Sequence, residues 1–200
     1  MANLKIIESV RSIEQKINKS LATQVNKVLP KAATRIKSRI LELATFALST
    51  SPEIASLSNG SLRGDFGLTS NVAGPLVDAI VSTLDVKVNK VNNNLQGGIT
   101  LVMQPSDFSN LFSLPFAYQP IEGGNIPWLE WLLTLGDAVI IADFGVELGS
   151  GLGRSGKGHM VVGGPYKVNS AYSGVPDNNF ITRAIAKVSP QIKEVILKAI

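Results

Sequence analysis

Apolar and polar residues alternate along residues 137–148, and this pattern predicts a half-buried β-strand. Side chains of successive strand residues point to opposite faces of a sheet, so a period of two gives the strand one apolar face. The polar face would carry Asp137, Asp143 and Glu147. The apolar face would be formed by Ala138, Ile140, Ala142, Phe144, Val146 and Leu148.

The segments that follow predict the antiparallel return of this strand. Residues 159–163 and 166–168 are suited to pair with it. The glycine-rich segment between the end of the first strand and residue 159 predicts a flexible hairpin tip. A further short strand is predicted at residues 99–104. Because a sheet with one apolar face needs cover, we expect helices to pack on it. The predicted fold class is α+β, with an antiparallel β-sheet flanked by a long N-terminal helix, a middle helix and a C-terminal helix.

The N-terminal part of the chain predicts two amphipathic helices in succession. Apolar residues recur every three or four positions up to Pro30, which is the spacing of one helix face. Pro30 disfavours helical geometry at Leu29, so we expect a kink or a break there. The first stripe consists of Ile6, Val10, Ile13, Ile17, Leu21, Val25 and Val28, and the second of Ile36, Ile40, Leu43 and Ala47.

A middle helix and a C-terminal helix are predicted further along the chain. The middle helix opens at residues 71–75, and its apolar positions continue to Val91. The final helix follows a cap region at residues 177–179 and is expected to be interrupted at Pro190. A short helix with Ser51 as its cap precedes the middle helix.

Residues 105–126 contain several prolines and glycines and predict a long loop with at most one helical turn. Loops of this length in compact domains usually have a function, although aromatic residues such as Phe116 and Tyr118 would also pin the loop to the body. The helix predicted directly after the loop carries Trp128 and Trp131. We interpret these four aromatic residues as anchors of the core or of a subunit interface.

Composition favours a single globular domain spanning residues 1–200. A chain of this length, with 44% hydrophobic residues, buries roughly 70% of its unfolded surface. The absence of cysteine excludes a disulfide framework and a thiolate metal site. The first residues do not form a secretory signal, and acidic residues interrupt the most apolar stretch, residues 128–146, so we expect no membrane span.

The net charge of +4 conceals an asymmetry along the chain. Residues 1–41 hold nine Lys and Arg against two Glu, a net charge of +7, and the remainder carries −3. The sequence thus predicts a basic helical N-terminal arm, about residues 1–48, suited to nucleic acid or to an acidic protein surface. An ordinary solvated lysine face is the simpler alternative. The candidate contact residues of the arm are Lys27, Lys31, Arg35 and Arg39.

Residues 151–157 contain two incomplete nucleotide-binding motifs. GLGRSG matches the dinucleotide fingerprint, but that motif needs a helix after it, whereas a strand is predicted from His159. The same stretch matches most of a phosphate-binding loop, but Gly158 occupies the place of the Ser or Thr that binds magnesium. We therefore expect no cofactor. A hairpin tip carrying Arg154 and Lys157 is the simpler interpretation, and its two cations suit a polyanion or an acidic neighbour.

An enzymatic function would have to use Asp143, Glu147 and His159. Two carboxylates and a histidine could bind a metal or perform acid–base chemistry. However, the chain holds one histidine and lacks the GxSxG motif of a nucleophile elbow. A solvated outer strand face explains the same residues, so we assign no catalytic residue and no metal ligand.

Several short runs form a recognisable set of tryptophan, glycine and asparagine motifs. They are PWLEWLL (127–133) with Gly136-Asp137, GRSG (153–156) with GHM (158–160), YKV (166–168), Ser173-Gly174, NNFITRAI (178–185), and Ser56-Leu57 with LRGDFGL (62–68). Together they resemble the neck and tail-completion proteins of tailed bacteriophages, which include tail terminators.

The resemblance implies a small α+β fold that assembles as a homo-oligomeric ring of six subunits. Such a ring would join the portal-connector or adaptor proteins of the head to the tail tube protein, in a virion assembled in the host cytoplasm. Arg154 and Lys157 would then contact packaged DNA in the lumen, or a partner subunit. A non-specific nucleic-acid-binding protein that uses the basic N-terminal helix remains the alternative, followed by the enzyme considered above.

Overall fold

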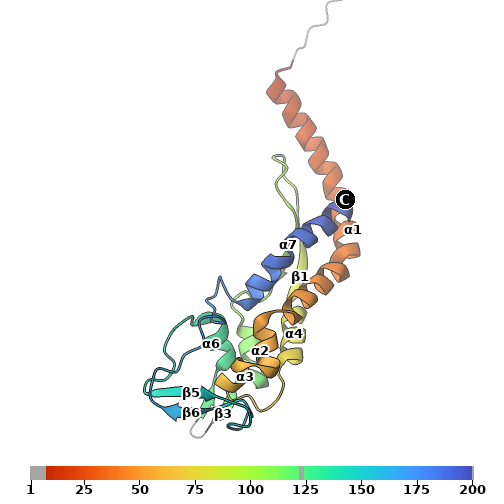
Figure 1. Cartoon of the computed structure of the whole chain (residues 1–200). Coiled ribbons are helices and arrows are strands. Elements are labelled where there is room, and N and C mark those ends of the chain that lie inside the picture. The colour runs from red at the N-terminus through yellow and green to blue at the C-terminus, as the bar shows by residue number, and fades with distance from the viewer. Residues whose placement is uncertain (1–7, 122–123, 200) are drawn as a thin grey trace, which may run out of the picture.

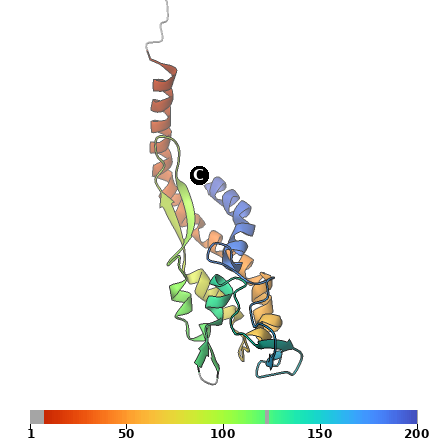
Figure 2. The ribbon, with the colours of Figure 1, turned by 90° about the vertical axis from the view of Figure 1, so that its left-hand side faces the viewer.

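The computed structural model describes residues 8–121 and 124–199, and its mixed helix-and-sheet architecture confirms the predicted α+β class. The helices are α1 (Val10–Ser49), α2 (Pro52–Asn59), α3 (Ser61–Asp65), α4 (Ala73–Ser82), α5 (Ser109–Phe112), the 3₁₀ helix η1 (Pro115–Ala117), α6 (Trp128–Thr134) and α7 (Phe180–Ala199). The strands are β1 (Leu84–Asn89), β2 (Gly98–Met103), β3 (Gln119–Ile121), β4 (Gly124–Ile126), β5 (Phe144–Leu148) and β6 (Gly158–Val162). The molecule is elongated, with the N-terminal half of α1 extending from one end and strands β3 to β6 at the other (Figures 1 and 2).

The long helix α1 is continuous over 40 residues, so the two helices predicted on either side of Pro30 are one. Of the predicted kink or break, the kink is present, because the helix axis changes direction midway (Figure 1). Proline removes one backbone hydrogen bond and crowds the preceding turn, which bends a helix. Packing offsets this cost, because Leu29 and Ala32 on either side of the proline are buried and α1 packs along α7. The helix starts at a cap in which the Ser9 hydroxyl accepts a hydrogen bond from the Ser12 backbone N–H.

The C-terminal helix α7 begins at the predicted cap but is not interrupted at Pro190, contrary to expectation. The Asn179 side-chain oxygen accepts hydrogen bonds from the backbone N–H groups of Ile181 and Thr182, at 3.1 and 3.2 Å. Pro190 lies on the exposed side of the helix, where its ring disturbs no packing. The buried side chains of α7 are Phe180, Ile181, Ala184, Val188 and Ile192.

The middle helix is shorter than predicted, because α4 ends at Ser82 and residues 84–89 form strand β1. The apolar residues Leu84 and Val88 are four apart, a spacing that fits a helix. With Val86 between them they also fit the period of two of a strand, and pairing with β2 decides the outcome. Strand β2 itself was predicted and is confirmed.

The hairpin of β1 and β2 lies beside α1 (Figure 2). Leu84 pairs with Met103 at its base, and Asn26 of α1 holds its far end. The Asn26 amide donates a hydrogen bond to the Val91 carbonyl oxygen at 2.9 Å and accepts one from the Val91 N–H at 2.8 Å. The hairpin therefore braces the start of the extending part of α1.

The segment at residues 105–126 has more structure than the predicted loop. Its helical turn is present as α5, followed by η1, and the strands β3 and β4 form a hairpin that the sequence did not predict. Phe108 and Leu111 are buried and fix the segment to the body.

The strand predicted at residues 137–148 is less than half as long in the structure, where β5 has 5 residues. Gly136 and Asp143 have φ values of 57° and 64°, which lie in the left-handed region that an extended strand does not contain. Strand β5 therefore starts at Phe144, and only Ile141 of the preceding stretch bridges to Tyr166. Among the described residues the strands form three separate two-stranded sheets, so the expectation of one sheet is wrong.

The hydrophobic core is made by helices packing on helices. Phe66 packs on Trp128 with ring centroids 5.6 Å apart, and the Trp128 indole N–H donates a hydrogen bond to the Phe116 carbonyl oxygen at 2.7 Å. Burying a large apolar side chain contributes about 1.5–3 kcal/mol. The largest fully buried side chains are Trp128, Phe66, Phe180, Leu29, Ile40, Leu48, Leu57, Leu62, Leu68, Leu76, Ile80 and Leu111. The helices thus hold the body together, and the hairpins extend from it.

Candidate functional site

One face of α1 turns apolar side chains outward along the arm. These residues are three, four or seven apart, so they lie in one row on the helix. Val10 is 81% exposed and Ile17 is 52% exposed, and Leu21 and Val28 are similarly open. Ala22 and Leu29, by contrast, lie on the face turned toward the body. The outward row of the arm consists of Val10, Ile13, Ile17, Leu21 and Val28.

The same row continues as a basic and then a mixed surface. Lys31, Arg35 and Arg39 follow Val28 at intervals of three and four residues and are exposed. Arg39 forms an ion pair with Glu42 at 2.8 Å, and Phe46 ends the row with an exposed fraction of 65%. The outward face of α1, defined as residues 10, 13, 17, 21, 28, 31, 35, 39, 42 and 46, is thus apolar first and basic second.

The predicted arm residues are distributed over two faces of the helix. Lys31, Arg35 and Arg39 belong to the outward face, whereas Lys27 lies about 100° away from Val28 and is also exposed. Within the described residues, Lys27, Lys31 and Arg35 have no acidic partner within ion-pair distance. Their charges are therefore available to an anionic partner.

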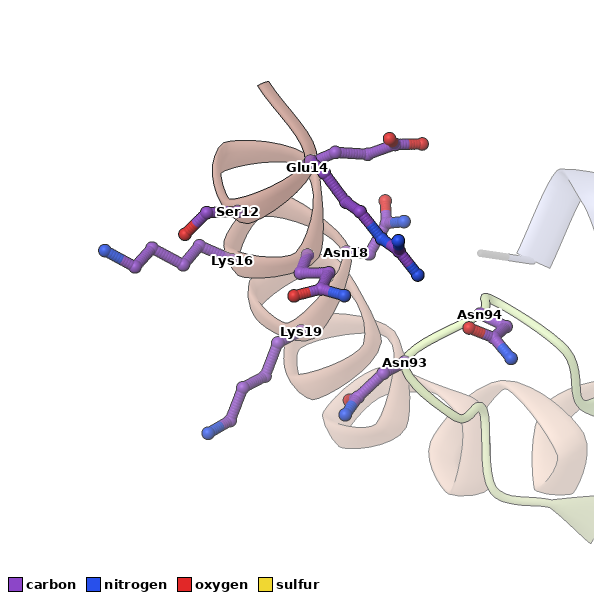
Figure 3. A pocket seen from close by; sticks show the side chains of 9 residues that line it. Ser12, Glu14, Lys16, Asn18, Lys19, Asn93 and Asn94 are labelled. Atoms are coloured by element: carbon purple, nitrogen blue, oxygen red, sulfur yellow. The ribbon is translucent and has the colours of Figure 1, made fainter. Parts of the chain in front are cut away.

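A polar hollow of about 650 Å³ lies between the start of α1 and the tip of the β1–β2 hairpin (Figure 3). Its lining includes Lys16 and Lys19 from α1 and Asn93 and Asn94 from the hairpin. Lys16 forms an exposed ion pair with Glu8. In Figure 3 the lysine side chains extend away from the asparagines, so the polar groups do not converge on one point. This hollow has the character of a solvated surface and not of a small-molecule site.

The β5–β6 hairpin exposes a second apolar surface, at the opposite end of the molecule. Opposed residues of an antiparallel pair lie on the same face, and here Phe144 opposes Val162 and Val146 opposes Met160. Val162 is 85% exposed, and Phe144 and Met160 are also exposed. The helical cover expected on this face of the strand is therefore mostly absent among the described residues.

This surface opens into an apolar groove of about 680 Å³. The groove runs between the end of α3, the β3–β4 hairpin and the β5–β6 hairpin. Its apolar lining consists of Phe66, Ile121, Ile126, Ile141, Phe144, Val146 and Met160, and its ionisable lining of Asp65, Arg154 and His159.

Gly64 of α3 sets the position of the hairpin that forms one wall of the groove. A Cβ atom at Gly64 would lie 2.8 Å from the Leu148 side chain and 2.8 Å from the Lys157 carbonyl oxygen. Only glycine permits this approach, since such contacts are closer than van der Waals distance.

The glycine-rich tip joins β5 directly to β6, which confirms the predicted hairpin. Strand β6 begins at Gly158, where a dinucleotide-binding loop would begin a helix. Arg154 is exposed and donates a hydrogen bond to the Pro120 carbonyl oxygen at 3.4 Å. Lys157 is half-buried, and its backbone N–H donates to the Ser155 hydroxyl. The tip thus folds against β3. Of its two cationic residues, Arg154 is the more exposed.

The four predicted aromatic anchors divide between core and surface. Trp128 is fully buried, and Trp131 is half-buried with its ring edge-on to Tyr166 at 6.3 Å between centroids. Phe116 is half-buried, whereas Tyr118 is exposed beside Arg154 in a second, smaller hollow. Tyr118 is therefore the member of this set that can contact another molecule.

The three residues considered for catalysis do not form a cluster. His159 and Glu147 oppose each other across the hairpin with 3.8 Å between His159 Nε2 and Glu147 Oε2, and both are exposed. Asp143 lies before the strand in a left-handed turn. The described residues contain no group of three His, Cys, Asp or Glu side chains placed to hold a metal ion.

Two acidic groups that the sequence did not single out occupy sheltered positions. Glu53 is buried and accepts a hydrogen bond from Arg183 at 2.7 Å, which ties α2 to α7. Burial raises the pKa of Asp65 to about 6. Burial, and then the neighbouring Asp65 charge, raises the pKa of Tyr166, whose hydroxyl donates to the Asp65 carbonyl oxygen. The Glu53–Arg183 pair therefore stabilises the body, whereas the charged form of the Asp65 carboxyl is disfavoured by its burial.

The outward face of α1 is the feature that sequence reasoning missed. Its apolar half was found as a stripe, but nothing in the sequence distinguishes a stripe that covers the body from one left open.

Comparison of the chain with protein-family models, with curated proteins and with solved structures gives no match. None of the described helices combines the length and apolar character needed to cross a bilayer.

Proposed function

We propose that this chain is a structural protein of a tailed-phage neck, a tail terminator or tail-completion ring that joins the tail tube to the head connector. The motif resemblance supports this proposal. The observation that carries it is the pair of open apolar surfaces at opposite ends of one elongated subunit (Figures 1 and 2). Monomeric proteins rarely leave such surfaces free, whereas ring subunits need two different surfaces, one for each neighbour.

The proposed ring is a hexamer located in the virion, between the portal-connector or adaptor proteins and the tail tube protein. It acts by contact and not by catalysis. Arg154 and Lys157 lie at the hairpin end and would contact packaged DNA or an adjoining ring through charge alone, without reading sequence.

This function is tested by measuring the molar mass of the purified chain in solution. Light scattering after size-exclusion chromatography, over a range of concentrations, should give a closed oligomer, either alone or after addition of the tail tube protein. A monomer under both conditions would overturn the proposed ring.

A second candidate is a non-specific nucleic-acid-binding protein, favoured by the exposed cations Lys27, Lys31 and Arg35 on α1. Such binding weakens steeply with salt, because each phosphate contact releases counterions. A monomer that binds duplex DNA with this salt dependence, and loses binding when the three residues are replaced by glutamate, would favour this function over the ring.

A further inference from the structure

We infer that the hollow beside Tyr118 and Arg154 binds the carboxylate of an acidic segment of another protein. This hollow, the Tyr118 hollow, has a volume of about 390 Å³. Its walls are the loop before α4, the segment from η1 to β3 and the tip of the β5–β6 hairpin. The inference rests on the proposed function for the source of the segment, an adjoining chain of the virion, but the site itself lies within one subunit.

Arg154 is the one charged residue that lines the Tyr118 hollow, counted over the described residues. Its guanidinium donates a hydrogen bond to the Pro120 carbonyl oxygen at 3.4 Å, so it lies next to β3. Arg154 also borders the apolar groove, but neither Asp65 nor any other described acidic residue is within ion-pair distance of it. Most of its N–H donors therefore remain for a ligand, and the planar guanidinium matches the geometry of a carboxylate.

A buried polar side chain in the same lining also indicates a polar ligand. Gln119 is 8% exposed and lines the Tyr118 hollow. Within the described residues its amide makes one hydrogen bond, a donation at 3.5 Å to the carbonyl oxygen of the adjoining Pro120. Buried amides are normally hydrogen-bonded, and a glutamine amide has two donors and an acceptor. Gln119 thus has hydrogen-bonding capacity that a ligand in the hollow can use.

Two backbone N–H groups of the loop before α4 add further donors. Arg63 donates hydrogen bonds to the carbonyl oxygens of Leu68 and Thr69, at 3.3 and 3.2 Å. Because a trans peptide places its C=O and N–H on opposite sides, the N–H groups of Thr69 and Ser70 point away from Arg63. Both residues line the hollow, and neither N–H donates a hydrogen bond to another described residue. The hollow therefore offers donors from its loop as well as from Arg154.

A single cation favours a carboxylate over a nucleic-acid backbone. Proteins that bind nucleic acid through charge neutralise several phosphates with several cations. Lys157, the other cation of the hairpin tip, is half-buried and does not line the Tyr118 hollow. The exposed rim residues Pro115, Tyr118 and Pro120 can instead pack on the carbon atoms beside a carboxylate. An aspartate or glutamate in a protein segment has this combination of groups.

The test is a titration of the isotope-labelled chain with an acetylated and amidated hexapeptide of alternating glutamate and alanine, followed by NMR. The inference predicts saturable shifts of the amide signals of Thr69, Ser70 and Gln119. The matched hexapeptide with glutamine in place of glutamate should give no such shifts, because it lacks the carboxylates.

Two variants locate the binding. Arg154→Gln should weaken peptide binding at least tenfold, because it removes the charge-assisted hydrogen bonds to the carboxylate. The control is Lys31→Gln, which removes an exposed cation of α1 far along the chain from the hollow. It should leave the affinity measured at Gln119 unchanged. Equal weakening by both variants would show a general attraction of the peptide to a basic protein and would overturn the inference.

The remaining outcomes separate the ligand and the proposed function. No saturable response at the hollow overturns the inference. Shifts at Thr69 and Gln119 with inorganic phosphate or short duplex DNA, but not with the acidic peptide, assign the hollow to phosphate and also overturn it. A closed ring that forms equally well with Arg154→Gln, from a chain that gives no response to the peptide, overturns the inference and leaves the proposed function standing. An Arg154-dependent peptide complex of a chain that stays monomeric, with the tail tube protein included, supports the inference and overturns the ring.

Discussion

Replacing Gly64 by alanine should destabilise the protein and loosen the β5–β6 hairpin. The added Cβ would lie 2.8 Å from the Lys157 carbonyl oxygen, a backbone atom that cannot move without the hairpin. Overpacking of this kind costs about 1–3 kcal/mol. Because alanine has a higher helix propensity than glycine, the substitution also stabilises the helix by up to about 1 kcal/mol. The free energy of unfolding should therefore fall by about 1–2 kcal/mol, which lowers Tm by about 2–8 °C in a chain of this size.

The control for this experiment is Gly124→Ala. Gly124 is exposed in β4, its φ is not positive, and a Cβ there would meet nothing within 4 Å. The same substitution should therefore raise the free energy of unfolding, by about 0.5–1 kcal/mol. Thermal unfolding followed by circular dichroism measures both variants, and amide exchange in β5 and β6 should be faster in Gly64→Ala alone. If both variants are stabilised alike, the close packing of α3 against the hairpin is refuted.

Three further predictions concern charged groups. Arg183→Leu leaves the buried Glu53 without its partner. Breaking a buried ion pair costs about 3–5 kcal/mol. Because Arg183 is itself 38% exposed, we expect the free energy of unfolding measured by chemical denaturation to fall by about 2–3 kcal/mol. Adding Glu53→Gln to that variant should restore most of the loss, and no recovery would contradict the pairing. The pKa of Asp65 is higher in the folded protein, about 6, than its ordinary value of 3.8, so the folded state binds more protons between these values. The free energy of unfolding should accordingly fall as the pH rises from about 4 to about 6. The variant Asp65→Asn should lack this fall, and its free energy of unfolding at pH 7 should be higher by up to about 3 kcal/mol. The same pH profile in the variant and the natural chain would contradict the raised pKa of Asp65. Finally, Arg154→Glu with Lys157→Glu should leave Tm nearly unchanged but reduce the yield of infectious particles, whereas the matched reversal of the exposed Lys167 and Lys193 should not; equal yields would reject a contact role for the hairpin tip.

The helical part of the fold could be predicted because its signals are local. The Ser51 cap, the Asn179 cap and the left-handed Gly136 each act within a few residues and determine where a helix begins or ends. The β5–β6 hairpin was predicted for the same reason, since alternation and a glycine-rich turn are short-range features.

The errors arose where tertiary contacts outweigh local preference. Pro30 and Pro190 both weaken a helix locally, yet α1 and α7 pack along each other and continue through them. Residues 84–89 fit two periods, and only the partner strand β2 resolves the choice. Strand β5 was predicted too long because the left-handed turn at Asp143 has no sequence signal as clear as a glycine.

The candidate surfaces could be predicted in composition but not in placement. The basic arm and the cations of the hairpin tip are readable from the sequence. That Lys31 and Arg35 continue the open apolar row, while Leu29 turns to the body, depends on which side of α1 the rest of the chain occupies.

The most direct test of the proposed function is electron microscopy of intact virions at a resolution that traces this chain. We predict a ring of this chain between the portal-connector and the tail tube. Neck density that is fully explained by other chains, with this one absent from the particle, would contradict it.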